Sequence, residues 1–85
     1  ISMDSLKRIE KAENFLSDIG FSNFRVRMHG DLAKIEVSEK DFVKFSNYQL
    51  REKIVSSLKK FGFKFVSLDL MFFSSGNLSR AQIDE

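Results

Sequence analysis

Three basic residues on a predicted β-hairpin are the side chains of this chain best suited to bind an anion. Apolar and polar residues alternate on both sides of the Gly-Asp dipeptide at 30–31, which is typical of two antiparallel strands joined by a two-residue turn. Counting outward sets Arg25 opposite Glu36, and Arg27 opposite Lys34. Like charges that lie opposite each other destabilise a hairpin by roughly 0.2–1 kcal/mol. The pattern therefore predicts that Arg25, Arg27 and Lys34 bind a phosphate or carboxylate through charge-assisted hydrogen bonds.

An alternative interpretation is a solvated strand face on which these charges only pair with one another. It expects ion pairs between Arg25 and Glu36 and between Arg27 and Asp69. Exposed pairs of this kind contribute only about 0–1 kcal/mol to stability. The spacing of the residues is compatible with both interpretations.

Glu13 is a second candidate because its position conflicts with the helix expected around it. Apolar residues recur at helical spacing over 4–19, and Glu13 lies four residues after Ile9 and three before Leu16. Its carboxylate is either at the boundary of the apolar stripe and reaches water, or it faces a metal ion, a positive ligand or a neighbouring subunit. Glu13 and Glu36 together can supply oxygen ligands to a divalent metal ion, but they do not form a recognised metal motif.

The remaining pattern predicts an α+β fold with one domain over 1–85. The length of 85 residues suits a single sheet with helices on one side, and it is too short for a two-lobed enzyme. The composition, 42% hydrophobic with ten phenylalanines, is sufficient for a packed core. The expected elements are a helix over 4–19, the hairpin over 24–37, a helical turn over 38–45, a helix over 48–61 and a strand over 64–70.

This order, α-β-β-α-α-β, favours a two-layer sandwich in which a small three-stranded sheet has its helices on one face. The other face of the sheet would carry the arginines and would be bare. We therefore expect the chain to self-associate or to pack on another domain, and we expect residues 71–85 to form a flexible tail.

Several classes of function are disfavoured by composition. The net charge is only +2, with acids and bases mixed along the chain, so we expect no nucleic-acid partner. There is no cysteine for a disulfide or a thiolate metal site, and no apolar run approaches the roughly 18 residues of a membrane span. The chain also contains no glycine-rich phosphate loop, and its single histidine lies beside the hairpin turn. A cytoplasmic location is expected.

Four segments resemble the C-terminal domain of the LarE family, the ATP-dependent sacrificial sulfur transferases of nickel-pincer nucleotide synthesis. They are LKRIEKAE at 6–13, IGF at 19–21, FRVRMHGDLAKIEV at 24–37 and LKKFGFKFVSLDL at 58–70. The resemblance covers about residues 3–70. It departs in the tail, where relatives tend to read Gly-Tyr-Arg-x-Gly-Ser-Met-Asn and this chain reads FFSSGNLS at 72–79, without the arginine.

The resemblance implies a domain excised from a longer PP-loop enzyme. In that family an N-terminal domain adenylylates a carboxylate of a pyridinium dicarboxylate mononucleotide. A cysteine just before the C-terminal domain, or a bound cluster, then supplies the sulfur of a thiocarboxylate. ATP and Mg would belong to the full-length protein, and the fragment alone should be inactive. The implied partners are the missing PP-loop domain, further copies in a homo-oligomer, and a nucleotide substrate.

The resemblance also assigns roles to individual residues. Arg25 and Arg27 match the paired arginines that hold the substrate's phosphate or carboxylate, and Lys34 lies beside them. Glu13 and Glu36 match acidic positions expected at metal or subunit contacts. The alternatives from other classes are a non-catalytic interaction or regulatory module, and a small metal or anion sensor.

Overall fold

The antiparallel hairpin forms in the predicted register. In the computed structural model, which describes residues 2–73, strand β1 (Phe24–His29) pairs with strand β2 (Leu32–Val37). Arg25 lies opposite Glu36 and Arg27 lies opposite Lys34, as the counting from the turn predicts. Gly30 has a φ of 60°, and glycine at the first central position is what a type II′ hairpin turn requires.

The third strand, β3 (Phe65–Leu68), lies on the other side of β2 and runs parallel to it. A parallel pair needs a crossover connection, which is formed here by α2 (Glu39–Phe42), η1 (Val43–Ser46) and α3 (Tyr48–Lys60). Strand β3 is shorter than the strand predicted over 64–70. Lys64 and Asp69, which flank it, still donate backbone hydrogen bonds to carbonyl groups on the β2 side of the sheet. The predicted α+β class and element order are confirmed.

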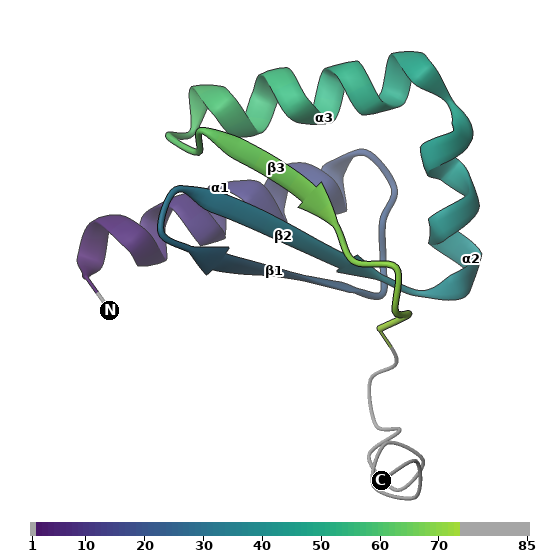
Figure 1. Ribbon diagram of the computed structural model, residues 1–85, viewed down its shortest axis with the longest axis horizontal. Helices are drawn as coiled ribbons and strands as arrows, with labels where there is room; N and C mark the ends of the chain where they lie inside the picture. Colours follow the sequence, from purple (N-terminus) through teal and green to yellow (C-terminus); the bar gives the residue numbers. More distant parts are fainter. Residues whose placement is uncertain (1, 74–85) are drawn as a thin grey trace, which may run out of the picture.

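Helices α1 (Met3–Asp18) and α3 cover one face of the sheet, with α1 packed on β1 and α3 packed on β3 (Figure 1). Each begins at a polar cap: the Ser2 hydroxyl accepts a hydrogen bond from the Ser5 N–H at 3.1 Å, and the Asn47 side chain accepts one from the Leu50 N–H at 3.1 Å. The caps fix where the two helices start.

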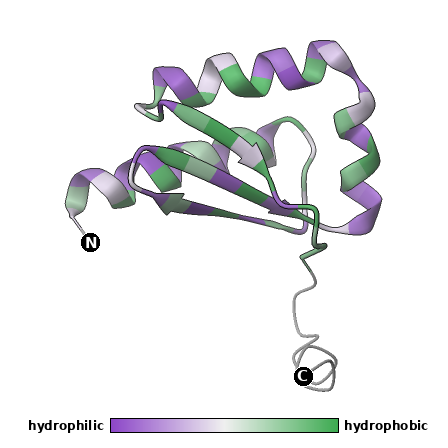
Figure 2. Cartoon of the chain, in the orientation of Figure 1, coloured by the Kyte–Doolittle hydropathy of each residue, from purple (hydrophilic) through white to green (hydrophobic). Residues whose placement is uncertain are grey.

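The core lies between these helices and the sheet. Hydrophobic and polar residues alternate along the strands in Figure 2, so that one face of each strand is apolar. The buried core residues are Ala12, Leu16, Phe21, Val26, Ala33, Ile35, Val37, Ile54, Leu58 and Phe63.

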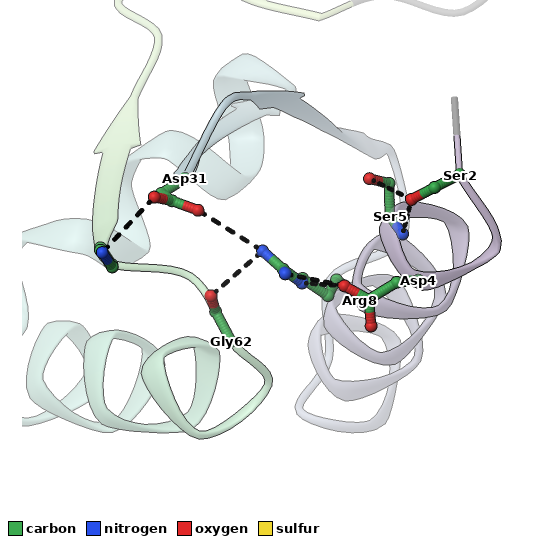
Figure 3. A network of polar contacts seen from close by, with 7 residues as sticks. Ser2, Asp4, Ser5, Arg8, Asp31 and Gly62 are labelled. Carbon is green, nitrogen blue, oxygen red and sulfur yellow. Dashed lines mark hydrogen bonds and ion pairs between the residues drawn. The ribbon is translucent and has the colours of Figure 1, made fainter.

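Arg8 joins three parts of the chain at the turn end of the hairpin (Figure 3). Its guanidinium lies 2.7 Å from the Asp4 carboxylate on α1 and 3.6 Å from that of Asp31 in the hairpin turn. It also donates a hydrogen bond to the carbonyl oxygen of Gly62, which follows α3. Gly62 has a φ of +114°, and a Cβ there would lie 3.1 Å from the Arg8 Nε, so the position favours glycine.

The chain continues beside β2 after β3 ends. The Phe73 N–H donates a hydrogen bond of 2.8 Å to the Val37 carbonyl, and the Phe72 ring packs edge-on against Phe42. Leu70 and Met71 are exposed. Most of the predicted tail, residues 74–85, lies outside the described residues.

Candidate anion-binding site

The sheet face that the helices leave uncovered carries three rows of side chains, each crossing β1, β2 and β3. The row farthest from the hairpin turn is charged throughout, the middle row is mostly basic, and the row nearest the turn is largely apolar. Taken in that order, with the register continued by one residue at Asp69, the rows are Arg25, Glu36 and Asp69; Arg27, Lys34 and Ser67; and His29, Leu32 and Phe65.

Glu36 is the centre of the charged cluster. Its side chain is only 9% exposed. The Arg25 Nε donates a hydrogen bond to its Oε1 at 2.8 Å, the Arg27 Nε lies 3.3 Å from its Oε2, and the Lys34 Nζ lies 3.7 Å from the same oxygen. One buried carboxylate thus holds three cationic groups and reduces the repulsion between Arg27 and Lys34.

The cluster carries an excess of positive charge. Asp69 adds a second carboxylate, 3.7 Å from the Lys34 Nζ, so three cations face two anions. The side chains of Arg25, Arg27 and Lys34 are 45%, 48% and 33% exposed, respectively. A guanidinium has five N–H donors, and Glu36 takes only some of them. The exposed donors can therefore bind a phosphate or carboxylate that approaches from solvent.

The two sequence interpretations each describe part of this cluster. The expected pair between Arg25 and Glu36 is present. The expected pair between Arg27 and Asp69 is wrong, because β2 separates β1 from β3 and brings Asp69 to Lys34 instead. Lys34 and both arginines lie around the Glu36 carboxylate, so the three cations are close together, and their binding of an anion stays a prediction.

Phe73 is a member of the site that the sequence reasoning missed. Its ring centroid lies 5.1 Å from the Arg25 Cζ, in a cation–π arrangement. The two consecutive phenylalanines at 72–73, a few residues after the last strand, were the available signal. It was not recognised because residues from 71 onward were expected to form a tail.

Glu13 lies apart from this cluster. On α1, its carboxylate accepts a hydrogen bond of 3.2 Å from the backbone N–H of Val26, at the edge of β1 that faces away from β2. Glu36 lies on the uncovered face of the sheet, whereas α1 packs on the covered face. Among residues 2–73 no group of three or more acidic, histidine or cysteine side chains is arranged to hold a metal ion. A metal or subunit contact of Glu13 or Glu36 stays a prediction.

Comparison with known proteins places this geometry in context. No protein-family model matches the chain. The pyridinium-3,5-bisthiocarboxylic acid mononucleotide synthase of Lactiplantibacillus plantarum is 34% identical over 82 residues, which are 93% of this chain and 28% of that protein. This similarity supports a relation of the chain to the LarE family.

Two further relatives are uncharacterised proteins. One, from Synechocystis, is 34% identical over 80 residues, covering 94% of this chain and 30% of its own length. The other, from Methanocaldococcus jannaschii, is 39% identical over 75 residues, covering 88% and 29%. The chain thus spans less than a third of the length of each relative. Within residues 2–73 no helix is long and apolar enough to span a membrane.

Proposed function

We propose that the chain is the substrate-binding domain of an ATP-dependent sulfur transferase. In the longer enzyme, a PP-loop domain with ATP and Mg adenylylates a carboxylate of a pyridinium dicarboxylate mononucleotide, and a sulfur donor then converts it to a thiocarboxylate. The observation that carries the proposal is the excess positive charge, exposed to solvent, around the buried Glu36. The relation to the mononucleotide synthase of L. plantarum supports a nucleotide as the ligand.

Within this proposal the cationic residues have different tasks. Arg25 is held between the Glu36 carboxylate and the Phe73 ring, so its guanidinium has a fixed orientation. Arg27 and Lys34 occupy the middle of the uncovered face and present their remaining donors to the ligand phosphate. Glu36 keeps the three cations together when no ligand is bound. A domain of this kind binds the substrate but does not transform it. The PP-loop domain, which carries out the adenylylation, is therefore its required partner.

The experiment is a titration of the 85-residue chain with nicotinamide mononucleotide, followed by two-dimensional amide NMR. We expect saturable shifts at the β1 and β2 residues of the cluster. Nicotinamide riboside, which lacks the phosphate, should shift the same residues only weakly. Arg27→Ala should weaken mononucleotide binding about tenfold, the effect of losing one charge-assisted hydrogen bond.

Lys53→Ala is the matched control, since it removes one positive charge from α3, away from the sheet's uncovered face. This variant should bind the mononucleotide as tightly as the original chain does. Equal binding by the Arg27→Ala variant would contradict the proposal, as would shifts that do not depend on the phosphate.

A further inference from the structure

A hollow lies on the covered side of the sheet, between β3 and the crossover helices. Its volume is about 630 Å³, which is within the usual range for ligand pockets. The lining is mostly apolar and is formed by Ile35, Phe42, Val43, Phe45, Ser46, Arg51, Ile54, Val55, Val66, Ser67 and Leu68. We call this hollow the β3 groove.

The β3 groove is bordered by a strand edge that is open to pairing. The N–H groups of Phe65 and Asp69 donate to carbonyls on the β2 side, so these alternate residues face β2. By the same alternation, Val66 and Leu68 direct their N–H and C=O groups away from β2. No backbone hydrogen bond connects either residue to a loop or helix in the described part of the chain.

The opposite edge of the sheet, formed by β1, is not open to pairing. There the Glu13 carboxylate accepts a hydrogen bond from the Val26 N–H, and α1 packs against β1. Proteins commonly block their strand edges to avoid unwanted pairing. Among residues 2–73, one edge is blocked by a side chain, whereas the other is left open beside an apolar groove.

The positive charge of Arg51 at the β3 groove favours a ligand that carries a negative charge. Arg51 is the one charged residue of the lining, and it has no ion-pair partner among residues 2–73. It lies in the first turn of α3, where the helix dipole favours negative charge, yet that turn contains no acidic residue. A carboxylate of a bound ligand would be attracted both by the Arg51 guanidinium and by the N-terminal end of α3.

We propose that the β3 groove binds an extended segment of a partner protein by β-strand addition. The segment pairs with the outward N–H and C=O groups of Val66 and Leu68. Alternate apolar side chains enter the groove, and an acidic group reaches Arg51. Val43, which is 68% exposed at the rim, covers the bound segment from the other side. This site is on the other side of the sheet from Glu36, so it stands whether or not the substrate-binding proposal holds.

The test uses the 85-residue chain and a synthetic peptide of about seven residues, close to the usual strand length, in which valine alternates with threonine before a final aspartate. We expect amide shifts along β3, and slower hydrogen exchange at Val66 and Leu68 when the peptide is bound. A peptide of the same composition with its valines placed consecutively should bind at least several-fold more weakly. Equal binding of the two peptides would overturn the proposal.

Two variants identify the groove without altering the core. Val43→Lys, at the exposed rim, should weaken peptide binding severalfold. Arg51→Gln should weaken it about fivefold, the upper range for an exposed ion pair. Replacing the final aspartate of the peptide with asparagine should weaken its binding to the original chain by the same factor. Lys60→Gln, at the far end of α3, is the control and should bind normally.

Two further results would also overturn the proposal. One is protection of the Val66 and Leu68 amides by dimerisation of the chain without peptide. The other is protection in the free chain that disappears when the chain is shortened to end at Phe73, since residues 74–85 would then be the occupant.

Discussion

At the scale of single residues, Glu36 determines what the uncovered face can do. In the described part of the chain it is the one carboxylate within reach of all three cations, and its side chain is nearly buried while theirs are not. An anion that binds there does not replace Glu36. It uses donors that Glu36 leaves free, so the carboxylate acts as an internal counter-ion that orients the arginines before the ligand arrives.

Replacing Glu36 tests this function directly. Glu36→Gln leaves Arg25, Arg27 and Lys34 together without their shared carboxylate, so we expect a loss of about 1–2 kcal/mol of stability, reduced by solvent screening of the exposed cations. The measurement is urea unfolding at low and high salt. Salt should restore part of the loss, because it screens the repulsion among the cations.

Glu52→Gln is the control for that experiment, since Glu52 is exposed on α3 and forms no ion pair in the described part of the chain. It should change stability little at either salt concentration. A Glu36→Gln variant whose loss is the same at low and high salt would show that repulsion among the cations is not the cause.

At the scale of elements, the sequence predicts local structure well and long-range placement poorly. The hairpin register follows from a period of two and a Gly-Asp turn, and both helix caps follow from polar residues before apolar stripes. The contact between Lys34 and Asp69 does not follow, because it depends on β3 pairing in parallel with β2. Nor does the position of Phe73, which depends on a backbone hydrogen bond to Val37.

The cap of α3 provides a prediction at this scale. The Asn47 side chain accepts the Leu50 N–H, and α3 forms one wall of the β3 groove. Asn47→Ala should therefore cost about 1 kcal/mol of unfolding free energy. Thermal unfolding followed by circular dichroism measures this cost. Gln49→Ala, an exposed change two residues along, should be close to neutral, and equal effects of the two substitutions would contradict a capping role.

At the scale of the whole molecule, the exposed apolar groups predict which surface contacts other protein. Phe65 is 63% exposed and lies on the uncovered face, in the row with Leu32 and His29. It is therefore next to the basic row that we assign to substrate. A large aromatic side chain left in solvent on a half-bare sheet is typical of a contact surface.

The last prediction concerns association through that face. We expect the 85-residue chain to self-associate reversibly as its concentration rises, and Phe65→Ser to reduce the association because it removes the largest exposed apolar group of the face. Sedimentation velocity over a range of concentrations measures this. Tyr48→Ser is a close control, since Tyr48 is 64% exposed but lies on α3.

Association through the uncovered face would leave the Val66 and Leu68 amides open to exchange, because they point along the sheet's outer edge rather than from its face. Hydrogen exchange at Val66 and Leu68 in the associated chain thus distinguishes association through the uncovered face from pairing at the β3 edge. A chain that stays monomeric at all concentrations, or that loses association equally with Tyr48→Ser, would show that Phe65 is covered only by the longer protein's other domains or not at all.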